Sequence, residues 1–389
     1  MGYPFGETIK GSDAGIPKNE LDRHVRAAQK AIQEKGLDLL LLTGPENIYY
    51  LSAQQTPGYY MFQCLCVPAE GEPFLFVRGL EAANARANTF VEEILFYEDG
   101  VNGAARLADE LVKRGYKNKR VGIDRRSWFL TIEQYETFVG AFGTLHDASG
   151  LLEPLRAVKS GYELEQIEKA AVCVELGMVA ALKAIREGAT ENDVAAAMIN
   201  AAYLQGSEYV GMEPFVCSGP RSGLRHATWR RRVLKSGDLV TLENAACVNR
   251  YHSALFRTAC VGPNVDEKAK AMREACVEGL DIALAELKPG NSCADVHNAV
   301  QKVIDKHGFT EHFRKRAGYS VGIAFAPDWG EGNVLSLNHD VDTELQPGMV
   351  FHMPISLCVH GVYTVCASET AIVTKSGSKA LSSLDRRQF

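Results

Sequence analysis

The stretch LKSGDLVTLENAACVNRYHSALFRT, residues 234–258, decides how the second half of the chain folds. Its runs of apolar and β-branched residues predict two strands, Leu239–Asn249 and Leu255–Val261. One carboxylate, Glu243, stands inside the apolar run LVTLENAAC. Because burial raises the pKa of a carboxyl group unless a partner intervenes, Glu243 is the first candidate for chemistry.

Helices and strands lie in blocks on either side of this stretch. Ser160 and Glu163 form the pattern of a capping box before a long amphipathic helix, about 160–187. Thr190 and Asp193 repeat the pattern before the next helix. The other predicted elements are helices at 191–205, 265–287 and 293–307, and strands at 213–218, 349–357 and 362–374. Such blocks predict an α+β domain.

The first 150 residues have a different pattern, in which strands and helices alternate. The predicted helices are 17–36, 104–114 and 132–142, and the predicted strands are 38–43, a pair within 65–77, and 120–124. Alternation of this kind predicts an α/β domain with helices covering a sheet. We therefore expect two domains, 1–157 and 158–389, which fits a chain of 389 residues.

Composition excludes several classes of protein. Lys and Arg number 42 against 48 Asp and Glu, so the net charge is −6, which argues against a protein that binds nucleic acid. No apolar run reaches the length of about 18 residues that a membrane span needs, so no membrane association is expected. Ordinary apolar content without low-complexity segments also argues against disorder.

The N-terminus and the cysteines indicate a cytoplasmic location. MGYPFGETIKGSD, residues 1–13, lacks the charged and apolar regions of a secretory signal and does not complete a myristoylation pattern. The ten cysteines include a C-x-C at Cys64 and Cys66 but no C-x-x-C, so a structural zinc site is not expected. Most of them lie in apolar runs, and we expect buried, reduced thiols.

Six segments, in order along the second domain, resemble the pita-bread family. That family includes methionine aminopeptidases, Xaa-Pro peptidases, creatinase and ectoine hydrolase. The segments are LRAVKSGYELEQIEKAA (155–171), SGPRSGLRHATW (218–229), LKSGDLVTLENAACVNRYHSALFRT (234–258), GYSVGIAF (318–325), LQPGMVFHMPI (345–355) and CASETAIVT (366–374). The first domain resembles the creatinase-type N-terminal domain in its α/β character and its NIYYL segment (47–51). The resemblance implies a creatinase-like domain followed by a pita-bread catalytic domain.

The peptidases of this family bind two metal ions through two aspartates, one histidine and two glutamates. By resemblance these five positions fall on Glu243, Ala254, Tyr319, Pro354 (or Met353 if one residue is missing) and Ser368. Only Glu243 keeps a carboxylate. A shift of one residue would bring Glu369 to the last position but would not restore the other three. The resemblance therefore implies a metal-independent member of the family that needs no cofactor.

Creatinase and ectoine hydrolase are the metal-free branch of this fold, and both hydrolyse a C–N bond at an amidine-like carbon. Such a carbon is electrophilic when protonated, so a cationic substrate replaces the charge that metals would supply. GYSVGIAFAPDWGEG (318–332), TLEN (241–244), FHMP (351–354) and HATW (226–229) resemble ectoine hydrolase more than creatinase. Residues 53–64 match poorly, although Gln63 and Cys64 agree. We expect a hydrolase of a small amidine or cyclic amidine.

Two residues are predicted to be catalytic. Glu243 would attack the amidine carbon as a nucleophile or activate a water as a base, and it would pair with a cationic substrate. The alternative is a carboxylate left at an old ligand position that only hydrogen-bonds. His226 resembles the histidine that creatinase uses for proton transfer, a task that suits imidazole near neutral pH. Its alternative is a surface histidine in an arginine-rich loop, where Arg225 and Arg230–Arg232 are either solvated or bind a substrate carboxylate.

Further side chains are predicted to bind the substrate. They are Tyr319, Trp229, Trp329, Asp328, Glu331, His352 and Tyr60. Tyr319 takes the place of the lost histidine and would donate a hydrogen bond, and His352 stands beside the old metal site. The two tryptophans and Tyr60 would form an aromatic wall for a cation. The alternatives are core packing for the aromatic residues and solvent exposure for the loop carboxylates.

Two other functions stay open. The chain could be a conventional Xaa-Pro dipeptidase, or a pita-bread protein that binds partners without catalysis, as the large histone-chaperone subunits do. Creatinase-type members are homodimers in which the N-terminal domain of one subunit closes the pocket of the other. The resemblance therefore implies a homodimer with a pocket shared between the subunits, and it leaves open whether residues 53–64 of the partner line that pocket.

Overall fold

The computed structural model describes residues 9–387. Residues 1–8, which make up most of the N-terminal stretch discussed above, lie outside the described residues, so the inferences drawn from them stay predictions. Two compact units divide the chain at Leu155 and Arg156, and each is described by itself. Ten free cysteines lie in the described chain, nine of them buried and Cys260 partly so.

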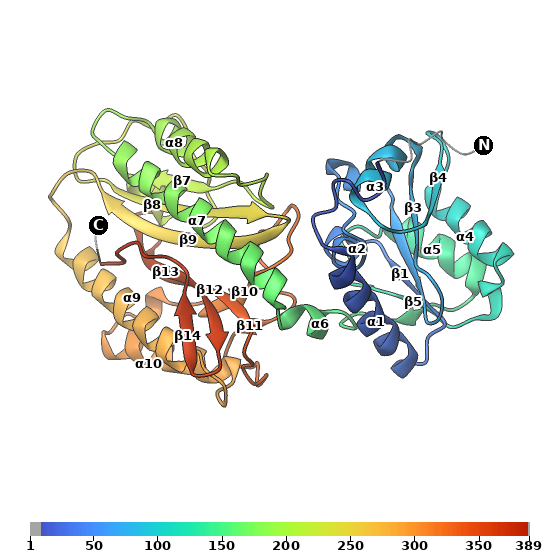
Figure 1. The fold of residues 1–389 in the computed structure, drawn as a ribbon. Helices are drawn as coiled ribbons and strands as arrows, with labels where there is room; N and C mark the ends of the chain where they lie inside the picture. Colours follow the sequence, from blue (N-terminus) through green and yellow to red (C-terminus); the bar gives the residue numbers. More distant parts are fainter. Residues whose placement is uncertain (1–8, 388–389) are drawn as a thin grey trace. The chain divides into compact units, whose positions relative to one another are not determined.

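The N-terminal domain is a mixed six-stranded sheet covered by helices, as predicted (Figure 1). The strand order is β4-β3-β2-β1-β5-β6. The strands are β1 (Leu39–Leu42), β2 (Cys64–Pro68), β3 (Phe74–Arg78), β4 (Glu93–Tyr97), β5 (Val121–Ile123) and β6 (His146–Asp147). The helices are α1 (Lys18–Glu34), α2 (Pro45–Ser52), α3 (Ala82–Asn88), α4 (Gly103–Lys113) and α5 (Ile132–Phe142), with α6 (Glu153–Ala157) at the end of the domain.

The centre of this sheet follows from its sequence. All four leucines of β1 are buried, with β2 antiparallel on one side and β5 parallel on the other. A strand buried on both faces has a continuous apolar run, which is what this segment shows. Helix α1 buries Leu21, Ala28 and Ile32 on one stripe.

The second domain is built on an eight-stranded antiparallel sheet. Its path is β11-β10-β12-β13-β9-β8-β7, with β14 paired to β13. The strands are β7 (Phe215–Ser218), β8 (Leu239–Val248), β9 (Tyr251–Cys260), β10 (Gly318–Ser320), β11 (Ser336–Leu337), β12 (Val350–Val359), β13 (Tyr363–Thr374) and β14 (Gly377–Ala380). The helices are α7 (Gly161–Ala184), α8 (Glu191–Leu204), α9 (Glu267–Glu286) and α10 (Cys293–Lys306).

Two helix pairs pack on one face of this sheet (Figure 1). Helices α7 and α8 share an apolar core with β8, in which Val240 and Leu242 take part. Helices α9 and α10 share another with β12 and β13, which contribute residues such as Met353 and Ala367. The opposite face, called the site face below, carries a smaller apolar cluster. Its buried members are Phe215, Ala245, Ala254 and Trp329.

A tight turn sets the register of the central hairpin. Asn249 and Arg250 both have positive φ, 48° and 61°, and join β8 to β9 as a two-residue connection. Such turns match the twist of antiparallel strands, and their length fixes which residues face each other. The strand predicted to begin at Leu255 therefore begins at Tyr251, because this connection is shorter than the sequence analysis expected.

Local signals account for the long helices. Ser160 accepts a bond from the backbone of Glu163, whose side chain accepts one in return, and Thr190 does the same with Asp193. Both predicted capping boxes are thereby confirmed. Among the described residues, no helix combines the length and the hydropathy that crossing a bilayer demands.

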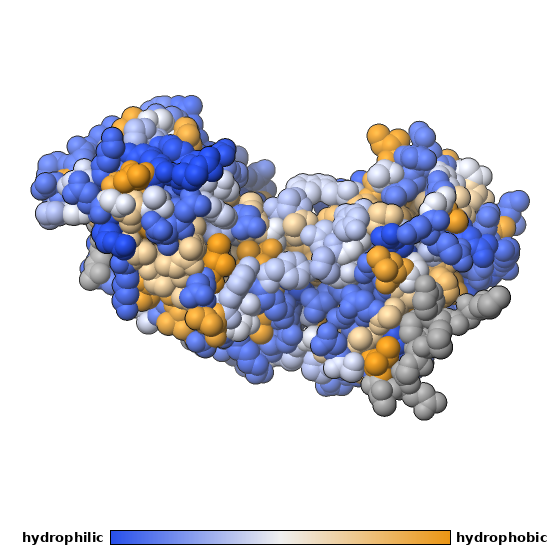
Figure 2. All heavy atoms as spheres, turned by 90° about the horizontal axis from the view of Figure 1, so that it is seen from above, coloured by the Kyte–Doolittle hydropathy of each residue, from blue (hydrophilic) through white to orange (hydrophobic). Residues whose placement is uncertain are grey.

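The face shown in Figure 2 is mainly hydrophilic, with apolar groups among the polar ones. The N-terminal domain strongly exposes several large apolar side chains. These are Tyr60, Leu80, Trp128 and Ile132, each between 71% and 78% exposed. Exposed apolar groups of this size indicate a contact surface when they gather in one patch.

Candidate active site

The strand period of two directs Glu243 to the site face. Its neighbours Leu242 and Asn244 point to the helix-covered side, where Leu242 is part of the core. In register, Glu243 stands opposite Phe215 of β7 and Phe256 of β9. Its side chain is partly exposed, unlike the buried residues before and after it. The carboxylate therefore lies on the site face of β8, between two aromatic strand neighbours.

The Glu243 carboxylate accepts no hydrogen bond from any residue in the described part of the chain. Burial raises the pKa of this carboxyl group to about 7, while the positive charge of Lys315 opposes the rise. Asp328 adds to the rise and Arg225 opposes it. At neutral pH both the protonated and the ionised form are thus populated. This suits a group that accepts and returns a proton.

A chain of hydrogen bonds runs across the site face from β10 to β13. The indole Nε1 of Trp329 donates to the Tyr319 hydroxyl at 2.9 Å, which bonds Nδ1 of His352 at 2.9 Å. Nε2 of His352 bonds the Ser368 hydroxyl at 3.0 Å. The backbone N–H of Phe256 donates to the same hydroxyl at 2.6 Å. The four side chains form one continuous network.

The protonation of this network follows from burial. Burial, with the positive charges of Lys315 and Arg257, lowers the pKa of His352 well below its usual value, so the imidazole is neutral. Burial and the negative Glu243 raise the pKa of Tyr319 well above its usual value, so the phenol keeps its proton. A neutral imidazole carries one N–H, so the Tyr319 proton is directed either to His352 or toward the site.

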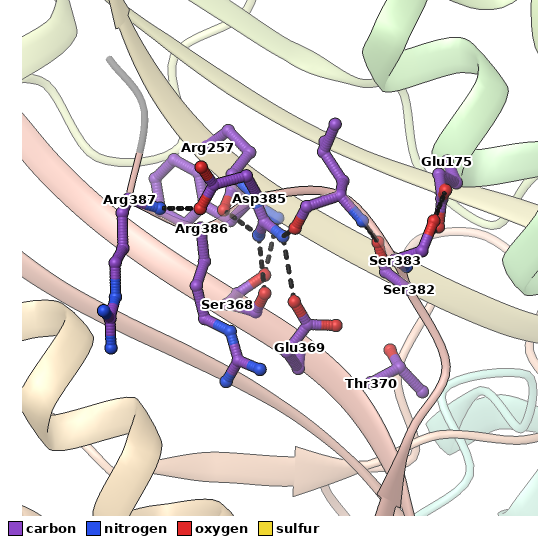
Figure 3. Close-up of polar contacts among 12 residues, drawn as sticks. Glu175, Arg257, Ser368, Glu369, Thr370, Ser382, Ser383, Asp385, Arg386 and Arg387 are labelled. Atoms are coloured by element: carbon purple, nitrogen blue, oxygen red, sulfur yellow. Dashed lines mark hydrogen bonds and ion pairs between the residues drawn. The ribbon is translucent and has the colours of Figure 1, made fainter.

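The family's five ligand positions meet on this face. Tyr319 pairs with His352, Pro354 pairs with Ser368, and Ala254 exchanges hydrogen bonds with the Thr370 hydroxyl. The two alternatives considered above are settled by strand alternation. Met353 lies in the core under α9, and Glu369 points to the helix-covered side, where it pairs with Arg257 at 2.9 Å (Figure 3).

These residues do not fit a dinuclear metal centre. Alanine and proline have no side-chain donor atom, and Tyr319 and Ser368 are occupied in the hydrogen-bonded chain. Within residues 156–387, no three His, Cys, Asp or Glu side chains lie close enough together to hold an ion. Glu243 is the one carboxylate at the five positions.

Lys315 is a site residue that the sequence analysis missed. Its ammonium donates to the backbone carbonyl of Pro354. Burial lowers the pKa of Lys315 to about 8, with Arg225 adding to the fall and Glu243 opposing it. In the sequence Lys315 stands in the basic run FRKR, which resembles a solvated charged segment. No local pattern marked it, because Lys315 lies in a bend before β10 and not in the strand itself.

His226 follows the short helical turn η5 (Gly219–Gly223) and reaches the same region. Its φ of 55° is unusual for a residue other than glycine, and its side chain is exposed. The imidazole stacks on Phe215, with ring centroids 5.5 Å apart. The Phe215 ring in turn packs against the Trp329 ring, with centroids 5.4 Å apart. Since Phe215 is the strand neighbour of Glu243, the imidazole lies one aromatic ring away from the carboxylate.

Trp229 and Trp329 have different surroundings. Trp329 is buried in the site-face cluster. Trp229 packs instead against the core that α7 and α8 share with β8. Strand β8 separates that core from Glu243. Trp229 therefore does not join the predicted aromatic wall, because it packs on the opposite face of the sheet.

The two loop carboxylates also differ. Asp328 is exposed, accepts a bond from the backbone of Gly330 at 3.0 Å, and acts on Glu243 through its charge. Glu331 is 2% exposed and bonds both Arg156 at 2.5 Å and Lys159 at 2.9 Å. Its carboxylate is neutralised inside the domain. We therefore assign Glu331 to the support of the 318–332 loop and no longer to substrate binding.

Tyr60 belongs to the other domain. It ends the short helix η2 (Pro57–Tyr60) and is 74% exposed. Its side chain is thus accessible on the surface of the N-terminal domain.

The fold and this site define the class of protein. The chain belongs to the metallopeptidase family M24, whose family model matches residues 165–375. Residues 24–158 match the Creatinase/Prolidase N-terminal domain. Family membership makes the chain a hydrolase of the creatinase and prolidase type, with the bond it cleaves left open.

Relatives within the family have different activities. The chain is 27% identical to an ectoine hydrolase of Halomonas elongata, over 91% of this chain and 93% of that protein. It is 25% identical to an Xaa-Pro dipeptidase of Pyrococcus furiosus, over 92% and 97%. The crystal structure of a prolidase from Pyrococcus horikoshii superposes with a TM-score of 0.83 at 23% identity, covering 94% of this chain and 100% of that one, which shows the shared fold.

Proposed function

We propose that this protein is a metal-independent hydrolase that cleaves a C–N bond of a small amidine or cyclic amidine. The observation that carries the proposal is the state of the five family ligand positions. Four lack a metal-binding side chain or use it in hydrogen bonds, while Glu243 remains with an unpaired carboxylate. An anion without a partner, partly buried, favours a cationic ligand.

The chemistry needs one proton acceptor and one water. Glu243 accepts a proton from the water as its oxygen bonds to the electrophilic amidinium carbon. The resulting tetrahedral carbon breaks one C–N bond, and the departing nitrogen takes the proton back. One amidinium and one water become one amide and one protonated amine, so atoms and charge balance. A pKa of about 7 for Glu243 suits a base of this kind better than a permanently ionised nucleophile.

Two neighbours support the proton transfers. Tyr319 keeps its proton and donates to a substrate nitrogen or to the new oxygen when His352 supplies its own N–H to the phenol oxygen. His226, exposed beside Phe215, relays the water proton between Glu243 and the departing nitrogen. Trp329 presents its ring edge to Tyr319 and holds the phenol in place.

We also propose a cytoplasmic homodimer. The ten unpaired cysteines suit a reducing compartment. The strongly exposed Tyr60, Leu80, Trp128 and Ile132 of the N-terminal domain favour a contact between subunits. Tyr60 of the partner subunit would then complete the aromatic side of the site, as the resemblance to creatinase implies.

The test measures metal content and ectoine turnover on one purified sample, with and without a chelator. Metal-free protein that opens the ectoine ring despite chelator, and loses this activity on Glu243→Ala, is the expected result. Two tightly bound metals per chain with cleavage of Xaa-Pro dipeptides would contradict it and favour the activity named for the Pyrococcus relative. No turnover of any amidine, together with a tight macromolecular partner, would favour a binding protein.

A further inference from the structure

We infer that Lys315 binds an anionic group of the substrate, so that the site takes a zwitterionic amidine, which carries a carboxylate as well as an amidinium. This inference rests on the proposed function and narrows its substrate class. It assigns a role in specificity to a residue outside the family's ligand positions.

The position of Lys315 is set by a backbone carbonyl. Its ammonium contacts the carbonyl oxygen of Pro354, which is paired with Ser368 of β13. Strand β10 begins only at Gly318, and its register joins Tyr319 to His352, so Pro354 has no partner strand on that side. The carbonyl of Pro354 is therefore available to hold the ammonium. Lys315 thus contacts the backbone at one of the family's five ligand positions.

The ammonium has bonding capacity left. A lysine ammonium has three N–H donors, and Pro354 is the acceptor that Lys315 contacts. No carboxylate forms an ion pair with Lys315 anywhere in residues 9–387, and Glu243 has none with a cation either. Yet each of these two groups acts electrostatically on the other. The site therefore presents one negative and one positive group, neither of which forms an ion pair within the described residues.

These charges select against a substrate that is only a cation. An amidine held by Glu243 would be repelled by the nearby ammonium unless it brought an anion of its own. A carboxylate on the substrate removes that repulsion and supplies the missing acceptor. A role for Lys315 in activating the reacting carbon is not needed, since the protonated amidine carbon is already electrophilic. Recognition is the role that its charge supports.

Calorimetric binding with two matched probes tests this inference. One probe is ectoine, a cyclic amidine with a carboxylate, and the other is the same ring without the carboxylate. We expect wild-type protein to bind ectoine at least about tenfold more tightly than the bare ring. Lys315→Met should weaken ectoine binding by at least about tenfold and leave the bare ring bound equally or more tightly, because the repulsion is gone. Lys315→Arg should restore most of the ectoine affinity, since the charge is kept.

The control variant is Lys379→Met, which removes an exposed lysine on β14 that pairs with Glu168. It should bind both probes as the wild type does. Retained binding of the bare ring by Lys315→Met also shows that this variant is folded. The inference is overturned if wild-type protein binds both rings equally, if Lys315→Met weakens both equally, or if neither ring binds.

The outcome for the proposed function is separate. If wild-type protein binds the rings in the expected order but hydrolyses neither, the assignment of Lys315 holds and the hydrolysis of this ring is refuted. If it hydrolyses the bare ring as fast as ectoine, the proposed function holds and the role of Lys315 is refuted.

Discussion

Two carboxylates of the same sheet point to opposite faces and have different partners. Glu243 in β8 faces the site face, where it accepts no hydrogen bond from the described residues. Glu369 in β13 faces the helix-covered side, is 1% exposed and pairs with Arg257, itself 2% exposed, at 2.9 Å (Figure 3). Burial raises the pKa of both groups, but in Glu369 a bound cation opposes the rise directly. Glu369 has a cationic partner inside the fold, whereas Glu243 has none among the described residues.

The residues around Glu369 also hold the C-terminal segment in place. Arg257 donates to the backbone carbonyl of Ser368 at 2.5 Å and to that of Leu384 at 3.2 Å. Ser383 donates from its N–H and its hydroxyl to Glu175 of α7 at 2.8 and 2.6 Å (Figure 3). Ser368 takes part in both regions, because its side chain belongs to the site and its carbonyl belongs to this network. The comparison teaches that stability and function are divided between the two faces of one strand.

The largest expected effect comes from Glu243→Gln. Removing the proton acceptor should lower kcat/KM for the amidine substrate by about 100- to 10,000-fold. The thermal midpoint of the catalytic domain should stay the same or rise, because a neutral amide replaces a carboxylate whose charge is costly to bury. Initial rates with ectoine and thermal unfolding followed by circular dichroism measure the two quantities. An active variant would contradict the catalytic role of Glu243, and one that unfolds at a clearly lower temperature would show that Glu243 has a structural role.

Glu369→Gln should have the reverse effect, with stability lost first. It leaves Arg257 buried without its counter-charge, which costs about 3–5 kcal/mol of unfolding free energy. Denaturant unfolding of the variant measures this loss. Glu168→Gln is the matched control, since its exposed pair with Lys379 is worth less than about 1 kcal/mol. If the two variants unfold alike, the buried pair is not the structural element that we describe.

Ending the chain after Ala380 should have a smaller effect on the same side. The truncation keeps β14 but removes the Leu384 carbonyl from Arg257 and the Ser383 bonds from Glu175. Hydrogen bonds to charged groups such as Arg257 and Glu175 contribute about 1.5–3 kcal/mol. A chain that ends after Asp385 loses exposed contacts, among them those of Arg386 and Arg387 with Asp281, so it should change by less than about 1 kcal/mol. Equal stability of the two truncated chains would contradict this view.

The smallest effect is on the pH profile of the site. Activity should rise with pH through about 7, as Glu243 loses its proton, and fall through about 8, as Lys315 loses its charge. Lys315→Arg should extend activity to higher pH, because a guanidinium stays protonated there. The dependence of kcat/KM on pH for both proteins measures this. A falling limb that Lys315→Arg leaves in place would assign it to another group.

Much of the fold could be predicted because its signals are local. The apolar run of β1, the capping boxes at Ser160 and Thr190, and the ordered family segments all lie within short stretches of chain. The tight turn at Asn249 and Arg250 was not expected, because these residue types enter many kinds of connection and only the observed φ values define the turn. The short strand β10 was not predicted for a similar reason, since its stability comes from pairing with β11 and β12.

Sequence alone determined which residues occupy the family's positions, and so singled out Glu243 as the carboxylate that remains. Only the tertiary structure decided which charged groups have partners. Arg257 and Glu369 are 112 residues apart in the chain, and Glu331 meets Lys159 across 172 residues. Such pairs form when strands and loops far apart in sequence come together, and neither composition nor local spacing predicts which of them meet. Lys315 entered the site for the same physical reason, because the carbonyl that holds it belongs to another strand.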